Sequence, residues 1–349
     1  MGEPQSFTNG ASEASARCPV GVVAASTLTP NEIIRFARLA EELGYGEVWF
    51  AEDYFWVAGI SAAAAALTAT EEIPVGIGIV SAMVRHPAVL AMEIATIDAM
   101  HPGRLRPAIA LGNPGWIKQM GRVPRSQLQA LRETVTSVIA LLRGETLTSE
   151  GDEYSFEQVR LEYPSDVPVY MGAVGPKMHR LAGEIADATL SGVLSSPPYI
   201  RMVRAQIAAG RASRSHSTVS QPHRLATYAL YCVNDDGATA RKELRESVAF
   251  YLATLGGQSA LTDALGYGDR LLDMHTRGGT DPATLIAREL PDEWLDTLGI
   301  AGDPDQCAAK IQALLDAGSD AVILSAVPAM QTELQLRMTA REVLPRVTT

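Results

Sequence analysis

Short runs of apolar residues alternate along the chain with longer segments in which apolar positions recur every three or four residues. Eight runs stand out, at 20–24, 48–50, 75–80, 108–111, 167–171, 188–190, 225–233 and 321–324. Their continuous apolar character is typical of parallel strands that are buried on both faces. The helical segments between them predict crossover connections. Because eight parallel strands close a barrel, the pattern predicts an α/β fold of the (β/α)8 (TIM barrel) type.

Capping residues mark where several of the predicted helices begin and end. Thr29, Pro30 and Glu32 form a capping box with proline at the first helical position, and Gly44 follows the end of that helix. Asp303 begins the helix before the last strand in the same way. The predicted helices cover about 30–43, 58–70, 88–100, 126–142, 177–186, 198–209 and 331–343, with another after residue 236.

The strand spacing lengthens at two places. Residues 143–166 are predicted to form a small excursion such as a hairpin, and residues 247–300 form a larger insertion before strand eight. An insertion there should lie near the barrel mouth, as a lid or a substrate wall. Residues 18–349 are expected to form a single barrel domain. The small and polar residues of 1–17 predict a disordered tail.

Net charge and the cysteine and histidine content limit which binding partners and which kinds of site are expected. The formal net charge is −11, which argues against nucleic acid and, more weakly, against an anionic membrane surface. Three cysteines without CxxC spacing and six histidines without an HxxxH pattern predict neither a disulfide framework nor a metal site. No apolar stretch is long enough to span a membrane, and the N-terminal residues lack the features of a secretory signal. We therefore expect a cytoplasmic protein that acts on a small molecule.

The residues that follow the second strand are candidates for chemistry, because barrel active sites lie at the carboxyl ends of the strands. Glu52 and Asp53 are followed by the aromatic residues Tyr54, Phe55 and Trp56. This order favours a platform for a cofactor ring beside a carboxylate that handles a proton. A solvated acidic turn above packed aromatic side chains is the alternative.

Glycines mark the third and fourth strands. Gly76 and Gly78 interrupt the third strand, which indicates either close approach of a ligand, with a bulge, or close packing of a helix. The third glycine of a dinucleotide fingerprint is missing, so a Rossmann fold is not supported. Asn113, Gly115 and Trp116 follow the fourth strand and form either an ordinary turn or part of the site.

The turn after the fifth strand carries the strongest local signal. Its residues are Gly172, Ala173, Gly175, Pro176 and Lys177. Glycines allow backbone N–H groups to point at an anion, and a helix beginning at a proline adds its positive end. We predict that a phosphate group binds here, although a plain strand-to-helix turn would use similar residues. Ser195, after the sixth strand, either donates to the same ligand or belongs to the cap of the next helix.

Four stretches together resemble a known family. They are AEELGYGEVWFAED, the RHP that follows the third strand, ATIDAMHPGRLRPAIALG and PVYMGAVGPKMHRLAGEIADATLSG. Their order and spacing resemble the luciferase-like flavin and deazaflavin oxidoreductases, from about residue 19 to 215 and again at strand eight. The segment GPKMHRLAGE is most similar to the branch that uses coenzyme F420, which includes methylenetetrahydromethanopterin reductases. The insertion at 247–300 does not share in the resemblance.

The resemblance implies roles for particular residues. It implies a non-proline cis peptide bond at Gly78–Ile79 behind the central ring, and it assigns Glu52 and Asp53 to the neighbourhood of that ring. It also implies that the turn after the fifth strand binds the cofactor phosphate and that the protein forms a homodimer. Many relatives carry histidine where this chain has Asp53, so a histidine proton donor is not expected here.

We therefore expect a coenzyme F420-dependent oxidoreductase. Carbon 5 of the ring would exchange a hydride with a C=C, C=N or C=O bond of a small organic substrate, and Glu52 or Asp53 would supply or orient the proton, with Tyr54 as a weaker candidate. An FMN-dependent monooxygenase that uses reduced flavin and oxygen is the main alternative. A non-catalytic flavin-binding protein and a barrel aldolase or isomerase are less favoured, the latter because no Schiff-base lysine follows a strand.

Overall fold

The computed structural model describes residues 18–214, 222–256 and 259–348. The predicted tail of residues 1–17 lies outside the described residues. No helix among the described residues is long and apolar enough to cross a membrane.

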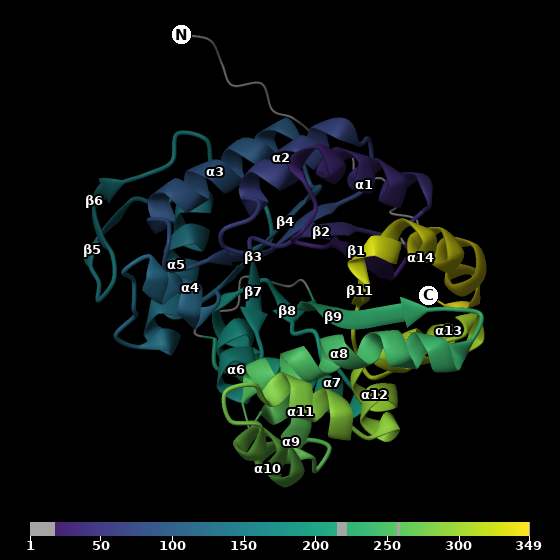
Figure 1. Cartoon of the computed structure of the whole chain (residues 1–349). Coiled ribbons are helices and arrows are strands. Elements are labelled where there is room, and N and C mark those ends of the chain that lie inside the picture. The colour runs from purple at the N-terminus through teal and green to yellow at the C-terminus, as the bar shows by residue number, and fades with distance from the viewer. Residues whose placement is uncertain (1–17, 215–221, 257–258, 349) are drawn as a thin grey trace.

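Eight parallel strands form a closed ring, as the hydrophobic pattern predicted (Figure 1). The strands pair in the order β1, β2, β3, β4, β7, β8, β9 and β11, and β11 pairs with β1. The pairing of β8 with β9 closes the barrel. The structure shifts two predicted strands. The fourth begins at Leu105 rather than 108, and the fifth begins at Tyr170 rather than 167, because Pro168 precedes it. The barrel strands are β1 (Val20–Ala24), β2 (Val48–Phe50), β3 (Val75–Ser81), β4 (Leu105–Ala110), β7 (Tyr170–Ala173), β8 (Ala188–Ser191), β9 (Arg224–Val233) and β11 (Ala321–Ala326).

Helices cover the barrel and begin at the predicted caps. The Thr29 hydroxyl and backbone N–H donate to the Glu32 carboxylate at 2.7 and 2.8 Å, and Asp303 forms the equivalent box with Gln306. The predicted helix 331–343 is α-helical only in part, because it continues as a π-helix over Thr339–Val343. The covering helices are α1 (Pro30–Glu42), α2 (Gly59–Ala69), α3 (Pro87–Met100), α5 (Gln127–Leu142), α6 (Pro176–Ile185), α7 (Pro197–Ala212), α8 (Gly237–Leu255), α13 (Pro304–Asp316) and α14 (Thr332–Met338).

Several elements lie outside the simple alternation. The predicted hairpin is present as β5 (Leu147–Glu150) and β6 (Ser155–Val159). The sequence pattern did not predict the short helix α4 (Pro114–Gln119) or the strand β10 (Ile300–Gly302), which extends the sheet beside β9. It also did not predict the 3-10 helices at Ala329–Gln331 and Leu344–Arg346. The insertion contains α9 (Ala260–Asp263), α10 (Gly268–Gly278), α11 (Pro282–Glu289) and α12 (Asp292–Leu298). Figure 1 shows α10 and α11 on the side of α8 that faces away from β9.

Aromatic side chains fill the inside of the barrel below its mouth. Trp49 lies edge-on to Tyr170 and to Tyr228, with ring centroids 5.7 and 6.0 Å apart. Gly76 pairs with Trp49 across the sheet, and a Cβ atom at Gly76 would lie 2.5 Å from Cε2 of that indole. Gly76 is therefore a glycine because the barrel interior holds a tryptophan, and neither a ligand nor a helix explains it.

Candidate active site at the barrel mouth

The bulge in β3 forms the floor of the mouth. The Gly78–Ile79 peptide bond is cis, as the resemblance implied, and the pairing with β4 shifts register between Gly78 and Val80. A Cβ atom at Gly78 would overlap the Tyr228 hydroxyl and lie 2.8 Å from Leu190 Cδ2. Tyr228 thus requires glycine at this position. Ile79 is half-buried and packs against the interior cluster, so the bulge presents an apolar surface at the mouth.

Glu52 is a buried anchor. Its carboxylate accepts from Arg85 Nη1 and Nη2 at 2.6 and 3.0 Å, from the Tyr54 hydroxyl at 2.8 Å and from the Gly59 N–H at 3.0 Å. Only 5% of the residue is exposed. Arg85 also pairs with Glu93 at 3.3 Å. Because both carboxylate oxygens are occupied, Glu52 fixes the segment between β2 and α2 and has little capacity left for a substrate.

Asp53 is the more available acid. It is half-buried and accepts a hydrogen bond from the Ser26 hydroxyl, which follows β1. Burial raises the pKa of Tyr228 and of Tyr251, and the nearby Asp53 carboxylate raises both further. Asp53 therefore acts electrostatically on two protonated phenols, one from β9 and one from α8. The sequence did not reveal Ser26 or Tyr251, because neither follows a motif.

Aromatic side chains line one rim of the mouth. Trp116 lies edge-on to Tyr54 and to Trp56, with centroids 6.3 and 6.0 Å apart, and Phe55 lies 5.9 Å from Tyr54. Phe55 and Trp56 are 66% and 59% exposed, so these side chains are not packed beneath the turn. Exposed aromatic rings gathered in one patch at the barrel mouth are suited to contact a ligand.

The predicted residues after β4 build the helix that carries this indole. Asn113 Oδ1 accepts from the Gly115 N–H at 2.8 Å and from the Trp116 N–H at 3.4 Å. Asn113 is thus the N-cap of α4 and orients Trp116. A direct contact of Asn113 or Gly115 with a cofactor stays a prediction.

The predicted phosphate turn joins β7 to α6 at the same rim. Gly172 and Ala173 end β7, Gly175 is the N-cap of α6, and Pro176 is its first residue. A Cβ atom at Gly175 would meet no atom within 4 Å, so the space beside this backbone is open. Lys177 is exposed. Pro176 has no N–H and the Met178 N–H donates to the Gly175 carbonyl, so the backbone N–H groups of Gly175 and Lys177 are the ones at this helix start that suit a phosphate.

Buried side chains hold this turn in place. The Tyr199 hydroxyl donates to the Val174 carbonyl at 2.6 Å, and His179 Nε2 lies 3.1 Å from the same oxygen. Burial lowers the pKa of His179 to about 4, so the ring is neutral at ordinary pH. Ser195 donates to the Gly192 carbonyl at 2.8 Å, and its neighbour Ser196 caps α7. Ser195 therefore stabilises its own turn and keeps only acceptor capacity for a ligand.

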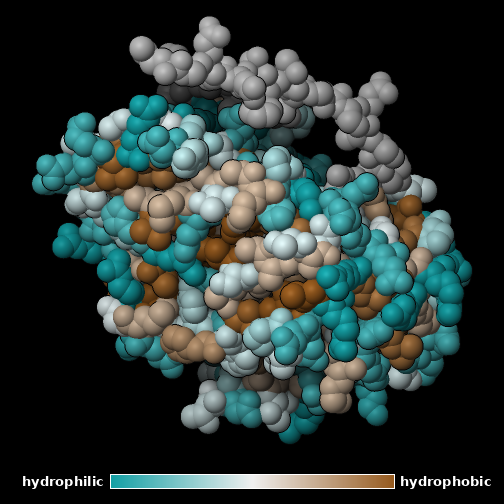
Figure 2. All heavy atoms as spheres, turned by 90° about the horizontal axis from the view of Figure 1, so that it is seen from above, coloured by the Kyte–Doolittle hydropathy of each residue, from teal (hydrophilic) through white to brown (hydrophobic). Residues whose placement is uncertain are grey.

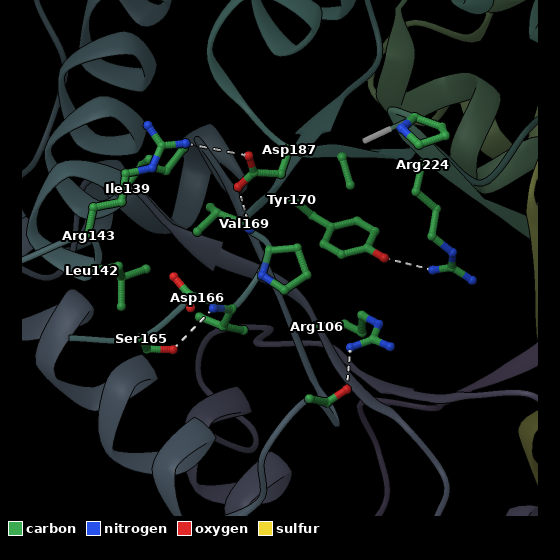
Figure 3. Close-up of a pocket in the computed structure, with 15 residues that line it drawn as sticks. Arg106, Ile139, Leu142, Arg143, Ser165, Asp166, Val169, Tyr170, Asp187 and Arg224 are labelled. Carbon is green, nitrogen blue, oxygen red and sulfur yellow. Dashed lines mark hydrogen bonds and ion pairs between the residues drawn. The ribbon is translucent and has the colours of Figure 1, made fainter. Parts of the chain in front are cut away.

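Two cavities differ in their position along the barrel. One of about 330 Å³ lies beside α8 at the mouth, lined by Leu230, Glu246, Ser247, Phe250, Tyr251, Ser325 and Val327. A larger one, of about 570 Å³, lies at the amino ends of β4, β7, β8 and β9 (Figure 3). There Tyr170 points toward Arg224 and accepts from it at 2.7 Å. Because this end of a barrel serves stability, we assign the chemistry to the mouth despite its smaller cavity.

Fold and site together define a class: a parallel (β/α)8 barrel with a cis-peptide bulge on its third strand and acids, aromatic rings and an open helix start around its mouth. The model of the luciferase-like monooxygenase family matches residues 11–321. The chain belongs to this family.

Two relatives and one solved structure that resemble this chain agree with this family assignment. The 5,10-methylenetetrahydromethanopterin reductase of Methanolobus tindarius is 28% identical over 331 residues, covering 90% of this chain and 95% of the relative. The F420-dependent glucose-6-phosphate dehydrogenase of Microbacterium testaceum is 28% identical over 343 residues, covering 91% and 94%. The structure of the coenzyme F420-dependent tetrahydromethanopterin reductase from Methanopyrus kandleri superposes with a TM-score of 0.79 at 25% identity, covering 95% of this chain and all of that chain.

Proposed function

We propose that this protein is a coenzyme F420-dependent oxidoreductase that transfers a hydride between the deazaflavin and a small organic substrate. The observation that carries the proposal is the bulge at Gly78–Ile79, which presents an apolar surface at the centre of the mouth. Coenzyme F420 is named for the glucose-6-phosphate dehydrogenase relative and for the solved Methanopyrus kandleri reductase, which supports this cofactor over others. The substrate would carry a C=C, C=N or C=O bond.

The residues present fit a flat ring joined to a phosphate. Ile79 would back the ring, and the exposed aromatic rim that includes Trp116 would border it. The phosphate would lie in the open space at Gly175, where the start of α6 supplies backbone N–H groups and Lys177 supplies positive charge. A net charge of −11 makes such a local arrangement necessary for an anionic cofactor.

The reaction would combine positioning with one proton transfer. When bound, the reduced deazaflavin supplies a hydride from carbon 5. Asp53, oriented by the Ser26 hydroxyl, would hold or move the accompanying proton. Glu52 would act through Arg85 and Gly59 by fixing the segment that carries Asp53. Tyr251, whose pKa is raised, would stay protonated and donate a hydrogen bond to the substrate.

The cavity beside α8 is the proposed substrate position. Its lining includes Tyr251, whose pKa is raised by burial and also by the Asp53 carboxylate. We propose that α8 walls this cavity and excludes water during transfer, while α11 of the insertion packs against α8 and supports it.

An FMN-dependent monooxygenase is the second candidate, favoured by the activity for which the family is named. It would use the same mouth but would consume oxygen, with which deazaflavins react poorly. Oxygen uptake during turnover with reduced FMN would support it.

A fluorescence titration with oxidised F420 and, separately, with FMN tests the cofactor. The proposal predicts micromolar or tighter binding of F420 and its loss in Gly175→Asp, because a carboxylate there would repel the phosphate. Ser149→Asp, an exposed change on the β5–β6 hairpin, is the matched control and should bind normally. Binding of FMN alone would favour the FMN-dependent monooxygenase. Binding of neither cofactor would contradict both candidate functions.

A homodimer is the proposed assembly. Figure 2 looks onto the face that carries α1, α2 and α3, where hydrophobic residues gather in several patches. Val89, Met92 and Met100 of α3 are among the exposed apolar side chains. Light scattering coupled to size exclusion should give twice the chain mass, and Met92→Glu should weaken the dimer. A monomer at all concentrations would contradict this assembly.

A further inference from the structure

We propose that the groove between α5 and α6 holds a polycarboxylate tail that extends from the cofactor's phosphate. The inference rests on the proposed function, since it deepens the cofactor site. The groove has a volume of about 310 Å³. It is lined by Ser126, Leu128, Gln129 and Arg132 from the start of α5, and by Lys177, Arg180, Leu181 and Glu184 from α6.

The groove carries excess positive charge in an acidic protein. Arg132 and Glu184 neutralise each other through two contacts of 2.7 and 2.8 Å, and this pairing lowers the pKa of Glu184. Lys177 and Arg180 have no carboxylate within 4 Å in the part of the chain that the structure describes. Arg180 acts on the Glu184 carboxyl through space and helps to lower its pKa, but the groove still holds three cations, Arg132, Lys177 and Arg180, against this one acid. Lys177 and Arg180 lie one helical turn apart and repel each other unless a further anion lies beside them.

The position of the groove connects it to the phosphate turn. Ser126 is the N-cap of α5, and Gly175 is the N-cap of α6, so the groove opens at the same rim of the barrel as the turn. A chain that leaves a phosphate at Gly175 along α6 would pass Lys177 first and Arg180 next. Leu128 and Leu181 would contact the methylene groups of such a chain.

The chemistry of the groove selects between cofactors. Two cations about one turn apart suit carboxylates spaced along a flexible chain, such as the γ-linked glutamates attached to coenzyme F420 beyond its phosphate. FMN ends at its phosphate and would leave the groove without an anion. Of the two cofactors, only the deazaflavin would place carboxylates in the groove.

The experiment compares tail-free F420, which carries no glutamate, with F420 carrying several glutamates, by fluorescence titration at low ionic strength. Two partly exposed ion pairs should make the long-tailed form bind about three- to tenfold more tightly to the wild type. Arg180→Ala should reduce this advantage, and Arg180→Glu should remove it. Both variants should leave the affinity for the tail-free form unchanged. Arg160→Glu, an exposed change on the β6 side, is the matched control and should retain the full advantage.

Each outcome decides the inference. Loss of the tail advantage at high salt would agree with it, because exposed charges are screened. Equal affinity for both forms in the wild type would overturn it, as would an Arg180→Glu variant that weakens both forms equally. If neither form binds, the proposed function itself fails, and the tail site fails with it.

Discussion

The buried pair of Glu52 and Arg85 allows a quantitative test of how the mouth is built. Arg85→Met would leave the Glu52 carboxylate, 5% exposed, without its cation. Removing one partner of a buried pair costs about 3–5 kcal/mol of folding free energy. Glu52→Gln should cost less, about 1–3 kcal/mol, because the amide oxygen still accepts a hydrogen bond and Arg85 keeps Glu93 at 3.3 Å.

The double variant separates this explanation from simple loss of packing. Glu52→Gln combined with Arg85→Met buries no charge, so its cost should fall about 1–2 kcal/mol or more below the sum of the single costs. Urea unfolding followed by circular dichroism measures all three. Arg35→Met is the matched control, since Arg35 is 73% exposed and lies 3.8 Å from its acid, and it should change stability by less than about 0.5 kcal/mol. A cost below about 1 kcal/mol for Arg85→Met, or strict additivity, would refute the reasoning.

Three further changes test other parts of the account. Asp53→Asn should keep stability within about 1 kcal/mol but lower turnover about 10²–10⁴-fold with unchanged F420 affinity, as steady-state and binding assays would show. Gly78→Ala should cost about 1–3 kcal/mol in urea unfolding, and Tyr228→Phe should recover part of it by removing the overlapped hydroxyl. Burial holds the pKa of folded His179 at about 4, against 6.5 when unfolded. Stability should therefore fall by about 2 kcal/mol as pH drops from 6.5 to about 5, and His179→Gln should make that loss shallower.

Local patterns predicted the barrel because strands and caps are encoded locally. Each of the eight ring strands is a short apolar run, and the boxes at Thr29 and Asp303 involve residues three apart. The short strand β10 was missed because Gly302 ends it after only two apolar residues, whereas the equally short β2 is apolar at all three positions. The fifth strand was predicted to begin at 167 rather than at Tyr170, because the residues before Tyr170 are also mostly apolar.

The candidate site was predictable only where it follows a strand end. The acids after β2 and the turn after β7 could be found in this way. The sequence did not show that Glu52 is buried against Arg85 while Asp53 is half-buried and bonded to Ser26. Arg85 lies 33 residues from Glu52, and Ser26 lies 27 residues from Asp53, so no local spacing records either pair. Gly76 was ambiguous for the same reason, because the side chain that requires it belongs to another strand. Contacts between distant segments decided which acid is buried and which is available.

A crystal structure with oxidised F420 bound tests the central claim most directly. The account predicts the deazaflavin ring against Ile79 at the barrel mouth, its carbon 5 facing the Asp53 side and its phosphate beside Gly175. Density for the cofactor in the larger cavity near Arg106 and Arg224, at the opposite end of the strands, would contradict the account.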